Sequence, residues 1–244
     1  MTLPESARPV QPTAQGSTEP PHDAGRGVIG NELLTALAGA ILLVLIVVEL
    51  VTTASLRTLM SAHVFLGVLL AGPLAVKLAS TGYRFVRYYT RSPAYVRRGP
   101  PLLALRLLAP LLIATTLVII GSGIGLIVTG PAQAGPLLPL HGFSVLVWLP
   151  LFAIHTVAHI LKVPRLVADD WSQPAAARAS GRGRRIGMNL GVLLFGAFAA
   201  ILLLPAAVPW IAWSQTNGKI PAPVIVGTIV AILALLATRP LRWR

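Results

Sequence analysis

Three histidines interrupt one long apolar stretch of the chain, residues 136–164. The stretch is almost unbroken over roughly 25 positions, which is enough to cross a bilayer core about 30 Å thick. Ionisable side chains inside such a segment usually mark a function. His141 and His155 are 14 residues apart, about 21 Å along a helix, and their rings point to nearly the same side. One helix could therefore offer an axial ligand to each of two stacked haems, and His159 shares the face of His155.

The whole chain has the composition of an integral membrane protein. Its 244 residues are 55% hydrophobic and 11% charged, with a mean hydropathy of +0.77, which is more apolar than a soluble domain of this length. The net charge is +13, but the cations lie in loops between apolar runs, which argues against a nucleic-acid-binding surface. The chain has no cysteine, which excludes disulfides, thiolate-ligated haem, iron–sulfur clusters and covalent haem attachment.

Six apolar segments predict an all-α fold, an integral membrane bundle of six helices. The expected spans are about 33–53, 59–79, 102–128, 138–162, 186–208 and 223–237, within a transmembrane domain over 33–244. Residues 1–32 are rich in Pro, Gly, Ser, Thr and Gln without an apolar period, so we expect a disordered tail there. The fifth and sixth spans are nearly devoid of polar residues, which suits two helices flanking a four-helix core.

The distribution of cations predicts the orientation. The loops after the second and fourth spans and the C-terminus are rich in Arg, whereas the loops after the first, third and fifth spans offer only Arg57, no cation and Lys219, respectively. By the positive-inside rule, both termini lie in the cytoplasm of a multi-pass protein of the cell membrane. Glu49, near the outer end of the first span, is expected at the membrane interface; a place on a proton or ligand path is the alternative.

This topology assigns a depth to each histidine. The second and fourth spans both run from outside to inside, so His63 and His141 lie at matched depth near the outer surface and are expected to form a haem pair. A step of 14 residues from His63 leads to Lys77, which is expected opposite His155 in the inner half. The ligand facing His155 stays open between Lys77, a residue from another span, and none.

The pairing of His63 with the stretch LHGFSVLVWLPLFAIHTVAHI, which begins at Leu140, resembles the membrane-bound b-type cytochromes. This superfamily includes respiratory di-haem cytochrome b subunits and ferric-reductase-like transmembrane proteins. The resemblance covers about residues 55–165. It implies a four-helix core that clamps haem b between histidines of two helices, with electrons passing across the membrane from one haem to the other. Lys77 departs from the pattern, which places a fourth helical histidine there.

Elementary chemistry supports these histidines as ligands of haem iron. Two neutral imidazoles from opposed helices give a six-coordinate, low-spin iron suited to electron transfer, since no ligand needs to leave. The propionates of haem require cations or donors: Arg57 is the candidate for an outer site, and Lys77, Arg84 or Arg106 for an inner one. His159 is a candidate inner ligand, a donor in a quinone site, or a packed interfacial ring.

Two other interpretations compete with this one. His155 and His159 have the i, i+4 spacing of a zinc or copper pair, but such a site needs further ligands, and there is no H-E-x-x-H motif. A cofactor-free small transporter or scaffold is the second alternative; a transporter predicts an internal repeat and broken helices, and we find no convincing repeat. We therefore expect an electron-transfer subunit rather than a stand-alone enzyme, which carries electrons across the bilayer between quinone or a cytoplasmic donor and a partner redox subunit. Membrane lipid is a further expected partner, and nucleic acid is not.

Overall fold

The computed structural model describes residues 22–97, 99, 103–160, 162–172, 181–217 and 222–237, and within these ranges it contains helices and no strands. The elements in chain order are α1 (His22–Ala54), α2 (Leu56–Tyr89), α3 (Pro93–Val96), α4 (Leu103–Thr129), η1 (Pro131–Gln133), α5 (Leu137–His159), α6 (Lys162–Ser172), α7 (Arg182–Leu203), η2 (Leu204–Ala207), α8 (Val208–Asn217) and α9 (Ala222–Ala237).

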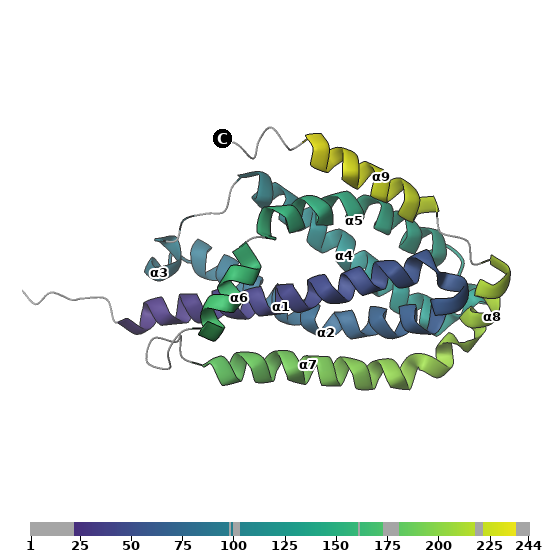
Figure 1. The fold of residues 1–244 in the computed structure, drawn as a ribbon, viewed down its shortest axis with the longest axis horizontal. Coiled ribbons are helices and arrows are strands. Elements are labelled where there is room, and N and C mark those ends of the chain that lie inside the picture. The colour runs from purple at the N-terminus through teal and green to yellow at the C-terminus, as the bar shows by residue number, and fades with distance from the viewer. Residues whose placement is uncertain are drawn as a thin grey trace, which may run out of the picture.

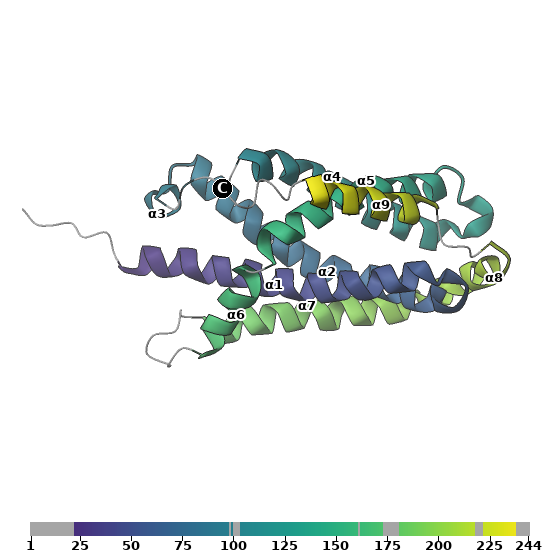
Figure 2. The ribbon, with the colours of Figure 1, turned by 45° about the horizontal axis from the view of Figure 1, so that its top comes forward.

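The long helices form two layers. In one layer α2 packs between α1 and α7, and in the other α5 packs between α4 and α9 (Figures 1 and 2). One end of the bundle holds the α1–α2 turn, η1 and α8, and we name it the α8 end; the opposite end holds α3 and α6, and we name it the α6 end. At the α8 end a core cluster joins the layers, with Met60, Val64 and Val68 of α2 against Leu126 of α4 and Trp210 of α8.

Small residues allow the first layer to pack closely. A Cβ atom placed on Gly72 of α2 would lie 2.5 Å from the carbonyl oxygen of Val192 in α7, and one on Gly196 of α7 would lie 3.2 Å from that of Leu69. Only glycine fits such an approach between two backbones, as in many helix pairs of membrane proteins. Helix α7 is thus fixed against the outside of α2.

Helix α2 is longer than the predicted span 59–79. It begins after Ser55, bends at Leu59, whose φ is −115° and ψ 19°, and contains Pro73. Its 34 residues extend about 51 Å at 1.5 Å per residue, well beyond a hydrocarbon core of about 30 Å. The helix continues beyond the apolar segment into the basic, aromatic segment that follows it. Its length therefore exceeds that of the apolar segment alone.

Among the described residues, five helices are long and apolar enough to cross a membrane: Gly27–Ala54, Leu56–Tyr89, Leu103–Thr129, Leu137–His159 and the composite Arg182–Asn217, which joins α7, η2 and α8. These helices indicate a multi-pass membrane protein. The predicted sixth span, 223–237, corresponds to α9, whose 16 residues rise only about 24 Å. The predicted count of six spans is therefore not confirmed.

Two predicted boundaries change. The fourth span, expected over 138–162, ends as α5 at His159, and Lys162 opens the separate, amphipathic helix α6. Part of the tail expected to be disordered is helical, because α1 begins at His22. The rest of that tail, residues 1–21, lies outside the described residues.

Candidate functional site

A large cavity separates the two layers. Its volume is about 1490 Å³, and its walls come mainly from α1, α2, α4 and α5, with Trp210 and Trp213 of α8 at one end. Pockets for drug-sized ligands occupy roughly 300–1,000 Å³, so this cavity has room for a larger ligand or for more than one. No residue of α7 lines it. Its four principal helices are those of the predicted core, and α7 flanks them.

His63 of α2 and His141 of α5 approach each other across the α8 end of the cavity. Their ring centroids are 6.4 Å apart, and the ring planes are inclined by 80°. Both side chains line the cavity. The sequence predicted this pair from the matched depth of the two histidines on parallel helices. The structure places their rings close together.

The ring of His63 is fixed by polar groups of α1. Its Nδ1 lies 2.8 Å from Oε1 of Glu49, with side-chain exposures of 21% for the histidine and 15% for the acid. The hydroxyls of Thr52 and Thr53 lie 3.5 and 3.3 Å from the same nitrogen. A carboxylate only accepts hydrogen bonds, so Nδ1 of His63 carries the proton and donates it.

The ring of His141 is fixed by α4. Its Nδ1 lies 3.1 Å from the backbone carbonyl oxygen of Ile119 and 3.1 Å from the hydroxyl of Ser122. The ring reaches this carbonyl because residue 123, one turn further along α4, is glycine: a Cβ there would lie 3.2 Å from Cε1 of His141. The carbonyl accepts, so Nδ1 is again the protonated nitrogen.

In each ring Nδ1 is therefore the hydrogen-bond donor. In a neutral ring this arrangement leaves Nε2 with a free lone pair, and within the described residues neither Nε2 makes a hydrogen bond. Histidines that bind a metal ion through one nitrogen commonly donate the other N–H to a carboxylate or a backbone carbonyl. Both acceptor types occur here, one for each ring.

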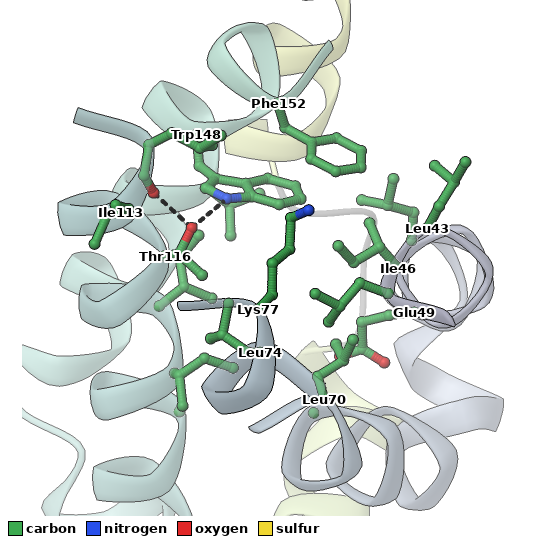
Figure 3. Close-up of a pocket in the computed structure, with 18 of the residues that line it drawn as sticks. Leu43, Ile46, Glu49, Leu70, Leu74, Lys77, Ile113, Thr116, Trp148 and Phe152 are labelled. Atoms are coloured by element: carbon green, nitrogen blue, oxygen red, sulfur yellow. Dashed lines mark hydrogen bonds between the residues drawn. The ribbon is translucent and has the colours of Figure 1, made fainter. Parts of the chain in front are cut away.

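The α6 end of the cavity is arranged differently. Lys77 is partly buried, and within the described part of the chain its ammonium has no hydrogen bond or ion pair. Figure 3 shows its side chain rising toward the rings of Trp148 and Phe152, which are stacked with centroids 4.5 Å apart. The Nζ atom also lies against α1, where a Cβ on Gly39 would be 2.8 Å away.

His155 and His159 line the same end but belong to one helix. Their rings stack with centroids 4.7 Å apart, and Nδ1 of His159 donates to the carbonyl oxygen of His155 at 2.9 Å. No histidine of another helix faces them within the described residues. Likewise, the described residues include no group of three or more His, Cys, Asp or Glu side chains that could hold a metal ion.

Only some of the cations predicted near the haem propionates line the cavity. Arg57 does not line the cavity; it donates to the carbonyl oxygen of Gln215 at 2.9 Å and thereby ties α2 to α8. Arg106 donates to the hydroxyl of Tyr89 at 2.9 Å, outside the cavity. Arg84 does line the cavity, together with Lys77.

The contact between Glu49 and His63 was not predicted from the sequence, which gave Glu49 a place at the membrane interface or on a proton or ligand path. Glu49 lies beside His63, and it lies as many residues before Leu56 as His63 lies after it. Two antiparallel helices joined by a tight turn place residues equidistant from the turn at equal depth. That symmetry was the signal that could have found the pair.

Comparison with protein-family models, curated proteins and solved structures finds no match for this chain. The functional assignment therefore rests on the geometry of the cavity and of its histidines.

Proposed function

We propose that this protein is a membrane cytochrome b subunit that binds haem b between His63 and His141 and carries electrons within the membrane. The observation that carries the proposal is the geometry of this pair: the rings come from two helices, their centroids are 6.4 Å apart, and each donates Nδ1–H to a protein acceptor. The likeness to membrane b-type cytochromes noted in the sequence agrees with it.

The spacing of the rings fits a shared metal ion. Two imidazoles bound to one ion at nitrogen–metal distances of about 2 Å have ring centroids roughly 6 Å apart. The cavity of about 1490 Å³ and its predominantly apolar walls suit a porphyrin, and Gly123 provides the flat wall against which His141 rests. The donor set, two neutral imidazoles without cysteine or methionine, is one of those used for haem iron.

Different residues of the chain would have different roles in such a site. His63 and His141 would hold the iron through Nε2, because Nδ1 of each ring is bound to a protein acceptor. Trp210 and Trp213 line the α8 end of the cavity. Haem b, when bound, supplies one-electron redox chemistry, and two permanent imidazole ligands favour electron transfer over ligand exchange.

A second haem at the α6 end is a weaker part of the proposal. His155 lines the cavity there, with Lys77 as the candidate opposite ligand and His159 as an alternative inner ligand or a donor to quinone. The absence of a histidine on α2 at this depth favours one haem rather than two. Haem stoichiometry distinguishes these versions.

We further propose that the α6 end faces the cytoplasm of the cell membrane and that a partner redox subunit exchanges electrons at the opposite surface. Arg84 and Arg87 lie in the last turns of α2, Arg91 follows that helix and Arg97 follows α3. Helix α6 begins with Lys162 at the same end. Cations gather on the cytoplasmic side of membrane proteins. Quinone and membrane lipid are the other expected partners.

The test is a dithionite-reduced minus oxidised absorption spectrum of the protein purified in detergent after expression with ample haem, with haem quantified per chain. We expect sharp reduced α and Soret bands and a stoichiometry near one haem, or near two if the α6 end also binds. A featureless spectrum would overturn the proposal and leave the cavity to a cofactor-free transporter or scaffold.

A further inference from the structure

Glu49 is an acidic side chain of the cavity that contacts a histidine, His63. Its Oε1 lies 2.8 Å from Nδ1 of His63, and the two side chains are 15% and 21% exposed. An acid at this depth is costly in a membrane helix unless it has a partner and a use. The contact with His63 supplies the partner.

The carboxylate is itself held in place by its own helix. The hydroxyl of Thr52 lies 3.0 Å from Oε2 of Glu49 and 2.7 Å from its backbone oxygen. Thr53 donates to the same backbone oxygen at 2.9 Å. Gly67 of α2 lies next to the acid, and a Cβ there would make an ordinary van der Waals contact with Oε1 at 3.6 Å. Both oxygens of the carboxylate are therefore engaged.

The two histidines of the pair differ in the charge of their acceptors. His141 donates to a neutral backbone carbonyl, that of Ile119, whereas His63 donates to a carboxylate. A negative acceptor draws the Nδ1 proton more strongly and makes Nε2 a more basic ligand. The site is asymmetric even though both iron ligands would be imidazoles.

We propose that Glu49 is a positioning residue that orients His63 and, through its negative charge, holds the midpoint potential of the bound haem low. The inference rests on the proposed haem site. Electron density passed from the carboxylate through the imidazole favours the oxidised iron, and hydrogen bonding to the ligands is one of the levers that set haem potentials.

Two substitutions of Glu49 separate charge from orientation. Glu49→Gln keeps an oxygen that accepts the Nδ1 proton of His63 but removes the charge; Glu49→Leu removes both. In the glutamine variant we expect haem content and low-spin bands like those of the wild type, with the redox equilibrium shifted toward the reduced form by about tenfold, or about 59 mV for one electron. The leucine variant should also lose haem, since loss of an outer partner weakens metal binding by about 10–100-fold.

The matched control is Glu32→Gln. Glu32 also lines the cavity, but it lies at the α6 end, where its Oε1 is 3.1 Å from Nζ of Lys162. We expect this variant to keep the wild-type potential. Equal potentials in the wild type and Glu49→Gln would overturn the role of Glu49 and leave the haem site standing. A wild-type protein without haem would overturn both.

Discussion

The two ends of one cavity hold similar residue types in different arrangements. At the α8 end, His63 and His141 come from different helices, and each ring has a fixed acceptor. At the α6 end, His155 and His159 stack on one helix, and Lys77 has no polar partner among the described residues. Residue types alone do not separate these ends. Orientation and partners do.

The largest expected effect is at the α8 end. His63→Ala and His141→Ala should each abolish the same haem, because one imidazole cannot form a six-coordinate bis-histidine site. Pyridine haemochrome content and difference spectra of the purified variants provide the measurement. Arg57→Gln is a suitable control, since Arg57 lies at the same end but outside the cavity. Loss of two different haems in the two histidine variants would break the pairing.

Substitutions at the α6 end sharpen the comparison. His155→Ala and Lys77→Met should leave the haem of the α8 end in place, with unchanged absorption bands. If the wild-type protein carries a second haem, His155→Ala should remove that one alone and halve the haem content. Complete loss of haem in either variant, with the protein still folded by circular dichroism, would show that the α6 end holds the cofactor.

A glycine pair on α4 tests whether the support of His141 matters. Gly123→Val should lower haem occupancy severalfold, because a Cβ at this position would lie 3.2 Å from Cε1 of His141 and displace its ring. Gly121→Val is the matched control, since nothing lies within 4 Å of a Cβ there, and both changes carry the same cost in helix propensity. Equal occupancy in the two variants would contradict a precisely held ring.

The smallest effect is expected for Gly39→Ala at the α6 end. The added methyl group would meet Nζ of Lys77 at 2.8 Å, but this atom is the free end of a flexible chain and can move. We expect wild-type haem content and a thermal unfolding midpoint that is equal or slightly higher, because alanine stabilises a helix interior by roughly 0.5–1 kcal/mol relative to glycine. A marked loss of haem would indicate that Lys77 is held in place by a ligand.

The sequence predicted the coarse arrangement well, because apolar length and helical rise are local properties. It gave the helical class and the long helices α1, α2, α4 and α5, and it placed His63 and His141 at one depth. Helix α9 corresponds to the predicted sixth span, but its 16 described residues leave that span unconfirmed. Hydropathy reports the environment of a segment, and length decides whether it crosses.

The polar contacts around the histidines were not predictable in the same way. The partner of His141 is the backbone carbonyl of Ile119. Every residue has such a carbonyl, so the residue types do not identify this acceptor. Gly123 of α4 admits the ring of His141, a role that the glycine alone does not reveal. Glu49 met His63 because the turn before Leu56 sets the register of α1 against α2. Such contacts depend on the tertiary register of helix pairs.

Electron paramagnetic resonance of the oxidised wild-type protein, with His141→Ala beside it, tests the central claim most directly. Coordination by two imidazoles predicts a low-spin ferric signal, and the 80° between the ring planes predicts the highly anisotropic form given by nearly perpendicular imidazoles. The signal should vanish in His141→Ala. A high-spin signal in the wild type, or a low-spin signal that survives in the variant, would contradict a haem held between His63 and His141.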